Sequence, residues 1–339
     1  MSRATAAATR AAPVAQRVFY ALADGAVHSG EQLAGVAGVS RSAVLQALGA
    51  LQELGVAIEA TPEHGFQLAA PFVPLDITVI HSLLDGPLRE RIRHAEAAWS
   101  LASTNDALLA QGAPPCGQFD LQLSEHQSAG RGRRARPWFA PPGGALCFSL
   151  GWSFASLPRD APALSLAAGV CVLRALASLT RARVQLKWPN DLYVQGRKLG
   201  GILIELSGES AGPAFVVVGI GINCLLGAAL GRSVRDTGTT PTDLAALGVV
   251  RCDRNRLAAA LAGELVRGLE VFASQGLSAF APEWRDADAL AGLVVDVDAP
   301  AGLVVGHARG IDADGALCVQ GVDGLQRFNT GEVRVRARQ

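Results

Sequence analysis

The sequence predicts an α+β protein in three parts, and three observations support this prediction. Residues 1–72 carry apolar residues at helical spacing, followed by two short β-like runs. Residues 73–288 alternate strongly β-like runs with helical segments, which favours a mixed sheet with helices on one side. Residues 289–339 contain short β runs punctuated by Gly and Asp-Gly turns. We therefore expect domain limits near residues 72 and 288.

The composition is that of a folded protein. Half of the 339 residues are apolar and 18% are charged, so the chain can bury a sizeable core. A formal net charge of zero argues against a surface built wholly for a polyanion. The six cysteines are scattered, without a CxxC pair or a His at metal-ligand spacing, which predicts buried thiols in a reducing cytosol. No apolar run reaches the roughly 18 residues of a membrane span. We expect a cytoplasmic protein without membrane contact.

The N-terminal part predicts a winged helix-turn-helix. After a first helix over residues 14–23, Ser29 and Ser40 can cap two further helices that a Gly38 turn joins. Short apolar runs at 56–58 and 65–68 flank a turn and predict the hairpin of a wing. The third helix is expected to bury Val44, Leu45, Leu48 and Leu51.

In the central part the patterns predict helices and strands in alternation. Helices are expected over residues 89–95, 106–111, 161–179 and 254–272. Strands are expected over residues 119–123, 144–152, 184–188, 192–194, 198–206 and 215–222. Further strands are expected near the C-terminus, over residues 293–297, 302–309, 317–319 and 333–335.

Two central stretches carry the strongest signal for function. Residues 130–138 read GRGRRARPW and pack four arginines and two glycines into nine positions. Glycines let backbone N–H groups converge and guanidinium groups bind phosphate or carboxylate oxygens in pairs, so this loop predicts an anion site. The second stretch reads KWPND at residues 187–191 and RKLGG at residues 197–201. It holds the only two lysines, Lys187 and Lys198, among 30 Lys and Arg residues.

These stretches resemble, in order and spacing, the two motifs of biotin protein ligases, GRGRxGRxW and KWPND…KxxG. Residues 28–68 are similar to the DNA-binding domain of the bifunctional ligases that also repress biotin genes. Residues 310–317 resemble the SH3-like β-barrel that ends them. The resemblance covers nearly the whole chain. It implies a winged helix-turn-helix, a central catalytic domain like that of class II aminoacyl-tRNA synthetases, and an SH3-like C-terminal domain.

The resemblance also implies an ATP-dependent, AMP-forming reaction. The carboxylate of biotin would attack the α-phosphate of ATP, giving biotinyl-5′-AMP and pyrophosphate. Biotin would then pass to a lysine of a biotin carboxyl carrier protein, in acetyl-CoA carboxylase or another biotin-dependent carboxylase. Both groups that react first are anions, so cations are needed where they meet. Mg²⁺ would accompany the pyrophosphate rather than occupy a protein metal site.

Site residues follow from the same resemblance. Catalytic roles are expected for Lys198, Arg133 and Arg131. Biotin would contact Ser103, Thr104, Asn105, Gln127, Arg131, Gly132, Arg133 and Lys198. ATP or the adenylate would contact Arg133, Arg136, Trp138, Lys187, Asn190, Asp191 and Asn223. DNA would face Ser40, Arg41, Ser42 and Gln46.

Several roles have a second interpretation. Ser103, Thr104 and Asn105 could simply cap the helix that follows them. Asp191 could orient the ribose or the lysines, or approach Mg²⁺. Trp138 and Trp188 could be core aromatics. The helix-turn-helix could serve only packing or dimer contacts.

Two departures from the family pattern bear on function. Ala135 stands where the family usually has Gly, so a positive φ there would cost about 1 kcal/mol. Residues 236–241 lack the aromatic residue that folds over the adenylate in repressor-type relatives, which leaves adenine stacking and ligand-driven homodimerisation open.

Charge bears on the repressor role. Residues 1–72 hold four arginines and five acids, so this part should bind operator DNA weakly alone, although a homodimer could present two copies. The alternatives to a biotin ligase are a lipoate-type ligase and a biotin-sensing transcription factor without ligase activity. The paired motifs favour biotin, and the intact Lys198, Arg131 and Arg133 favour a working ligase.

Overall fold

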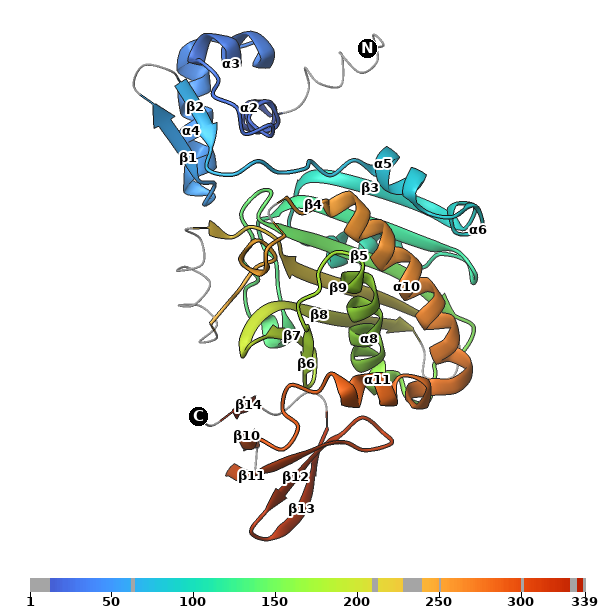
Figure 1. The fold of residues 1–339 in the computed structure, drawn as a ribbon. Coiled ribbons are helices and arrows are strands. Elements are labelled where there is room, and N and C mark those ends of the chain that lie inside the picture. Colours follow the sequence, from blue (N-terminus) through green and yellow to red (C-terminus); the bar gives the residue numbers. More distant parts are fainter. Residues whose placement is uncertain are drawn as a thin grey trace.

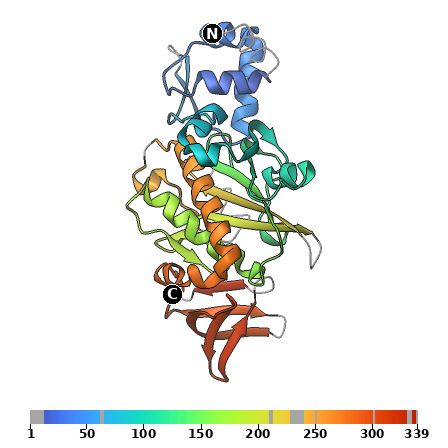
Figure 2. The same cartoon turned by 90° about the vertical axis from the view of Figure 1, so that its right-hand side faces the viewer.

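The structure, a computed structural model, describes residues 13–61, 65–208, 213–227, 240–249, 251–299, 302–329 and 334–337. It confirms the α+β class, with a helical N-terminal part, a mixed central sheet and a C-terminal antiparallel sheet. The helical part and the last strands lie at opposite ends of an elongated molecule, on either side of the central sheet (Figures 1 and 2).

The N-terminal part forms the predicted winged helix-turn-helix. Helices α2 (Val14–Ala21), α3 (Gly30–Ala37) and α4 (Arg41–Glu53) precede the antiparallel hairpin of β1 (Ile58–Thr61) and β2 (Gly65–Leu68). Residues 62–64 of the expected turn lie outside the described residues. Ser29 caps α3 by accepting from the Gln32 amide at 3.1 Å, while the Gln32 side chain accepts from the Ser29 amide at 2.7 Å.

The turn and the buried face of α4 agree with the sequence at all but one position. Gly38 has φ +64°, which fits the tight turn between α3 and α4. Val44, Leu48 and Leu51 are buried. Leu45 is half exposed, so its predicted burial is wrong: it points away from the small core that α2 and α3 build on the other side of the helix.

The central sheet has seven strands in the order β3-β4-β5-β9-β8-β7-β6. Only the β3–β4 pair is parallel. The strands are β3 (Ile92–Leu101), β4 (Phe119–Gln127), β5 (Ala145–Phe154), β6 (Gln185–Lys187), β7 (Asp191–Val194), β8 (Arg197–Gly208) and β9 (Ala214–Asn223). The predicted strands of this region are confirmed with shifts of a few residues at their ends.

The helix expected over residues 89–95 is wrong. The chain forms a single turn, α6 (Gly86–Arg89), and then enters edge strand β3, whose backbone pairs with β4. The alanines and charged residues of this segment favour a helix locally, but the pairing with β4 satisfies the backbone and overrides that preference.

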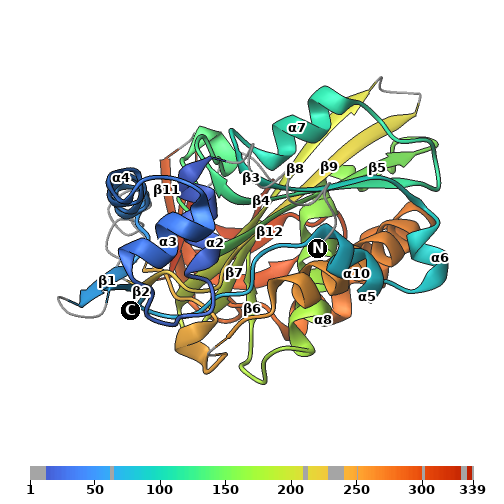
Figure 3. The same ribbon diagram turned by 90° about the horizontal axis from the view of Figure 1, so that it is seen from above.

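Helices cover the sheet unequally (Figure 3). Helices α8 (Leu164–Ala177) and α10 (Arg254–Gln275) pack on one face, with α5 (Ile77–Leu83) and α11 (Ala281–Asp286) beside them. Helix α7 (Thr104–Gln111) lies alone on the other face. The leucine stripe of α10 is buried as predicted, at Leu257, Leu261, Leu265 and Leu269.

A buried ion pair anchors the segment between the N-terminal and central parts. Arg254, at the start of α10, lies 2.6 Å from Glu125 of β4, and both side chains are 1% exposed. Arg254 donates to the Val73 carbonyl at 2.8 Å, and Glu125 accepts from the Leu75 amide at 2.7 Å. The linker after residue 72 is therefore fixed to the central core.

The C-terminal sheet has five antiparallel strands in the order β13-β12-β11-β10-β14. They are β10 (Val294–Ala299), β11 (Gly302–Ile311), β12 (Leu317–Gly321), β13 (Gly324–Phe328) and β14 (Arg334–Ala337). The sequence does not predict strand β13, because its apolar residues are few. The Trp188 ring is 2% exposed and donates to the Gly315 carbonyl at 3.0 Å, so it is a core aromatic that joins the two sheets.

Two remaining expectations concern cysteines and membrane spans. All six cysteines are free, and five are at least partly buried, whereas Cys116 is exposed against expectation. No single helix within the described ranges is long and apolar enough to cross a membrane. Helices α3 and α4 have the length and apolar composition of a membrane span only when taken together, as a pair bent by 94°.

Candidate functional site

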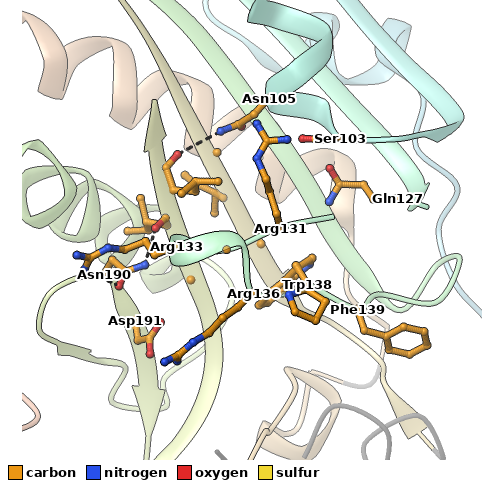
Figure 4. Close-up of a pocket in the computed structure, with 18 of the residues that line it drawn as sticks. Ser103, Asn105, Gln127, Arg131, Arg133, Arg136, Trp138, Phe139, Asn190 and Asp191 are labelled. Carbon is orange, nitrogen blue, oxygen red and sulfur yellow. Dashed lines mark hydrogen bonds between the residues drawn. The ribbon is translucent and has the colours of Figure 1, made fainter. Parts of the chain in front are cut away.

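A cavity opens beside the arginine loop, between that loop, the start of α7 and strands β8 and β9 (Figure 4). The structure brings nearly all predicted ligand-binding residues to its walls. They are Ser103, Thr104, Asn105, Gln127, Arg131, Gly132, Arg133, Arg136, Trp138, Asn190, Asp191, Lys198 and Asn223. Segments from four separate stretches of the chain therefore converge on one site.

The arginine loop closes on itself through backbone bonds. The Gly132 amide donates to the Arg136 carbonyl, and the Trp138 amide donates to the Gly130 carbonyl, both at 2.7 Å. A Cβ at position 130 would lie 2.6 Å from the Trp138 carbonyl oxygen, so this position requires glycine. Arg134 and Ala135 have φ of 58° and 55°. The backbone thus adopts at Ala135 the strained conformation for which the family usually supplies glycine.

One end of the cavity is lined by buried, uncharged polar groups. Ser149 of β5 lies with its hydroxyl 2.7 Å from Thr104 Oγ1 and 2.6 Å from Asn105 Oδ1. Thr104 donates to Gln127 Oε1 through its amide at 2.8 Å and its hydroxyl at 3.1 Å. Ser103 caps α7 through the Asp106 amide at 3.4 Å. The capping interpretation therefore holds for Ser103, while its neighbours face the cavity.

Arg131 points to this polar end, and two carboxylates hold it. Its guanidinium forms two hydrogen bonds with Asp106 and a third, of 2.8 Å, with Glu205. The bonds to Asp106, and then those to Glu205, raise the pKa of Arg131. Glu205 also accepts from Asn105 Nδ2 at 2.7 Å. Arg131 thus keeps its positive charge, which the carboxylates of Asp106 and Glu205 compensate.

The opposite end of the cavity is cationic (Figure 4). Arg133 points toward Asn190, with 3.4 Å between Nη1 and Oδ1. Burial and then the neighbouring charge of Arg134 lower the pKa of Arg133. Lys198 Nζ lies 2.6 Å from Asp191 Oδ1, which is the lysine-orienting arrangement considered for Asp191. An anion that enters here would meet partly desolvated cations.

Lys198 is also fixed through its backbone. Its amide donates to the Thr240 carbonyl, and its carbonyl accepts from the Thr242 amide, both at 2.8 Å. Asn223 donates to the Thr242 carbonyl at 3.0 Å. The segment after residue 239 therefore positions two of the predicted ligand contacts. Residues 236–239 of the non-aromatic stretch lie outside the described residues.

Two predicted nucleotide contacts, Trp138 and Lys187, lie in different surroundings: Trp138 lines the cavity and Lys187 does not. The Trp138 ring lies on β9, where a Cβ at position 221 would come within 2.5 Å of it, so Gly221 makes room for the indole. Lys187 does not line the cavity. Its ammonium lies 4.8 Å from the centre of the Tyr193 ring and 3.2 Å from the Tyr193 hydroxyl.

The predicted DNA-facing side chains are exposed on the N-terminal part. Arg41, Ser42 and Gln46 lie on the solvent face of α4, and Ser40 precedes it. Ser40 Oγ accepts from the Ala43 amide at 3.3 Å and lies 2.9 Å from Ser42 Oγ. The helix-turn-helix therefore presents a small polar surface that the rest of the protein leaves uncovered.

Sequence reasoning missed part of the site. The missed residues are Asp106, Ser149, Glu205, Gly219 and Gly221. None belongs to the two motifs. The only available signal was that Asp106 directly follows the Ser-Thr-Asn capping stretch. Within the described ranges no group of three or more His, Cys, Asp or Glu side chains could hold a metal ion.

Comparisons with known proteins give consistent matches along the chain. Residues 103–223 match the biotin/lipoate A/B protein ligase family, residues 292–336 the C-terminal domain of biotin protein ligases, and residues 17–67 an HTH domain. The bifunctional ligase/repressor BirA of Salmonella typhimurium is 36% identical over 93% of this chain and 95% of its own.

Two further relatives extend the comparison. The biotin–acetyl-CoA-carboxylase ligase of Mycobacterium tuberculosis is 36% identical over 68% of this chain and 88% of its own. The structure of the Aquifex aeolicus biotin protein ligase with biotin and ATP superposes with a TM-score of 0.62. It covers 73% of this chain and 100% of that protein at 24% identity, which supports the fold.

Proposed function

The chain belongs to the biotin protein ligase family, in the form that carries an N-terminal helix-turn-helix, and from this premise we propose that it attaches biotin to a carrier protein. In the first step the carboxylate of biotin attacks the α-phosphate of ATP, giving biotinyl-5′-AMP and pyrophosphate. In the second step the ε-amine of a carrier lysine attacks the mixed anhydride, an amide forms, and AMP leaves.

The observation that carries this proposal is the cationic end of the cavity. Arg133, Arg136 and Lys198 line one small space, and burial disfavours the charge of Arg133. Two anions that repel each other in water are stabilised together by fixed cations in a site of low dielectric. We assign Arg133 and Arg136 to the phosphate oxygens and Lys198 to the oxygen that bridges the two reactants, with Asp191 orienting its ammonium.

The polar end of the cavity favours biotin over lipoate. Thr104, Asn105 and Ser149 are each less than 5% exposed, and their hydrogen-bonding groups converge beside the cavity. A cyclic urea supplies N–H donors and a carbonyl acceptor to such groups, whereas a dithiolane ring would leave them without partners. Unpaired buried polar groups are the strongest means by which a site rejects a near-isostere.

Arg131 has a supporting place in this scheme. The sequence suggested a catalytic role, but its guanidinium is directed to Asp106 and Glu205 rather than to the cationic end. We propose that it shapes the biotin side of the cavity. We propose that Mg²⁺ enters with ATP, since substrate phosphates commonly supply several ligands of this ion and Asp191 is a carboxylate at that end.

A second function, biotin-responsive repression of transcription, is favoured by the exposed face of α4. Arg41 and Gln46 are available to base edges and phosphates, and the first half of the motif is capped and rigid. The carrier protein, operator DNA and a homodimer are the partners that this scheme requires.

We propose the domain limits 1–72, 73–288 and 289–339. The linker at residues 73–75 separates the winged helix-turn-helix from the central sheet, and the turn at Asp288 separates the central sheet from the C-terminal sheet.

Incubation with ATP, a carrier domain and either labelled biotin or labelled lipoate tests the ligase activity. We expect label in the carrier from biotin alone, with release of one pyrophosphate per adenylate. Lys198→Ala and Arg133→Ala should each lower the rate of adenylate formation about 100- to 1,000-fold, the usual effect of removing a preorganised charge stabiliser. Arg181→Ala, at an exposed position outside the cavity, is the control. Unchanged adenylation in Lys198→Ala, or transfer of lipoate instead of biotin, would contradict the assignment.

A mobility-shift experiment tests the repressor function. The full-length protein is titrated against promoter DNA of a biotin-related gene, with and without biotinyl-5′-AMP. Binding should strengthen with the adenylate and weaken in Arg41→Ala. A protein that adenylates biotin but never retards the DNA would leave only the ligase.

A further inference from the structure

The side chain of Asn105 is held from three sides at the polar end of the cavity. Glu205 Oε2 lies 2.7 Å from Asn105 Nδ2. Ser149 Oγ lies 2.6 Å from Asn105 Oδ1. Gly219 lies directly against the amide, since a Cβ at that position would come within 2.3 Å of Asn105 Oδ1. The plane of the amide is therefore fixed, and only its two ends could exchange.

Glu205 decides which end of the amide faces which neighbour. An ionised carboxylate only accepts hydrogen bonds, so the group of Asn105 that faces Glu205 must be its NH₂. The carbonyl oxygen must then face Ser149 and the cavity. Ser149 has a single hydroxyl proton, and both Thr104 Oγ1 and Asn105 Oδ1 lie within reach of it, so Ser149 satisfies at most one of the two lone pairs of the Asn105 oxygen. The second lone pair remains for a ligand N–H.

The arginine loop holds the Glu205 carboxylate in place by an ion pair. Glu205 Oε1 accepts from Arg131 Nη2 at 2.8 Å, and the remaining face of the guanidinium bonds to Asp106. Arg131 and Glu205 are both partly shielded from solvent. The two oxygens of this carboxylate therefore have separate donors, Oε1 the guanidinium of Arg131 and Oε2 the amide of Asn105. Arg131 therefore acts on the amide of Asn105 through Glu205.

From this geometry we infer that Glu205 is a positioning residue that makes Asn105 a hydrogen-bond acceptor toward the substrate. The inference rests on the proposed function, and it names the feature of the substrate that is read: a ring N–H, as in a cyclic urea. Asn105 touches the ligand, Glu205 orients Asn105, and Arg131 fixes the position of the Glu205 carboxylate.

The sharpest test exchanges the two groups. In Glu205→Gln the new amide can lie in two orientations. In the first its NH₂ faces Asn105, so that Asn105 must present its oxygen to the glutamine and turn its own NH₂ into the cavity. In the second its oxygen faces Asn105, and its NH₂ faces the guanidinium of Arg131, which then loses its hydrogen-bond acceptor. In the double variant Asn105→Asp/Glu205→Gln, the new glutamine donates to the new carboxylate at position 105, whose other oxygen again faces the cavity. The glutamine oxygen remains available to Arg131.

Steady-state adenylation gives the KM for biotin and for ATP separately. Glu205→Gln should raise the KM for biotin about 10- to 100-fold, the usual effect of a hydrogen bond to a charged partner, with the KM for ATP within about threefold of wild type. The double variant should regain at least about tenfold of that loss. Glu283→Gln, which removes the charge from an exposed pair with Arg174, is the matched control and should change neither constant.

The outcomes separate the two proposals. A Glu205→Gln enzyme with an unchanged KM for biotin, an equal rise in both KM values, or a double variant no better than the single one overturns the role of Glu205. Each of these results leaves the ligase assignment in place if the wild-type protein still adenylates biotin. A wild-type protein that does not adenylate biotin overturns the proposed function instead.

Discussion

Replacing Arg254 with methionine should destabilise the central part of the protein by several kcal/mol. Arg254 and Glu125 are each 1% exposed and lie 2.6 Å apart. The methionine would keep most of the apolar volume of the stem but leave the Glu125 carboxylate buried without a counter-charge. Breaking a buried pair on one side typically costs about 3–5 kcal/mol. The Val73 carbonyl would also lose the hydrogen bond that ties down the linker.

Urea denaturation followed by tryptophan fluorescence measures this cost. All five tryptophans lie between residues 73 and 288. Trp99 packs against Phe19 and Tyr20 of the N-terminal part, and the other four, Trp138, Trp152, Trp188 and Trp284, report the central part. With a slope of about 2–3 kcal/mol per molar urea, the midpoint should fall by about 1–2.5 M. Removing both charges, in Arg254→Met/Glu125→Gln, should cost less than the single change, because no isolated charge is then buried.

The same helix provides the control. Arg267 of α10 pairs with Glu264 at 2.7 Å, but its side chain is 54% exposed. Arg267→Met should therefore lower stability by no more than about 0.5 kcal/mol. Equal midpoints for Arg254→Met and Arg267→Met would refute the reasoning, since burial would then make no difference to the value of the pair.

Two further changes test stability elsewhere in the chain. Burial raises the pKa of Asp288 to about 6 from 3.8, and its Oδ2 has no hydrogen-bond partner. The folded state then binds the proton more tightly than the unfolded state, so this stability is complete below about pH 4 and is lost as the pH rises through about 6, by about 3 kcal/mol in total. Asp288→Asn keeps the acceptor for the Leu290 amide. Asp288→Asn should therefore gain stability relative to wild type as the pH rises: its free energy of unfolding minus that of wild type should be about 3 kcal/mol larger at pH 8 than at pH 4. A difference that does not change with pH would contradict this reasoning. Ala135→Gly should raise the free energy of unfolding by up to about 1 kcal/mol, because it relieves a φ of 55°. Ala110→Gly, at an exposed position within α7, should instead lower it by about 1 kcal/mol. Denaturant titration distinguishes the two signs, and a loss in Ala135→Gly would show that the loop carries no strain there.

The elements that the sequence predicted well are those with local causes. Ser29, Ser40 and Ser103 each cap the helix that the pattern predicted, because a capping side chain satisfies backbone amides only two or three residues away. The arginine loop was equally local: its glycines and arginines fall within nine consecutive positions.

The failures have nonlocal causes. Residues 92–101 form a strand because their backbone pairs with that of β4, and the residues of this segment do not by themselves indicate that pairing. Lys187 and Lys198 share one motif region, yet only Lys198 reaches the cavity, because Lys198 lies on β8, which borders the cavity, whereas Lys187 lies on the edge strand β6. The two lysines could be distinguished only after the sheet was assembled.

Glu205 shows why the partners that orient the predicted residues at the polar end of the site could not be predicted. Strand β8 is covered on both faces, with Ile202 and Ile204 packed in the large core and Leu203 and Glu205 on the side of α7. Alternation of apolar and polar residues reveals a face only when one side is exposed to water, so an isolated Glu near the end of such a strand suggests an exposed position. Its partners, Asn105 and Arg131, are 100 and 74 residues away in sequence. A site that binds an anion through adjacent arginines can be encoded in one loop, whereas a site that must present one lone pair in one direction depends on three strands and a helix meeting in register.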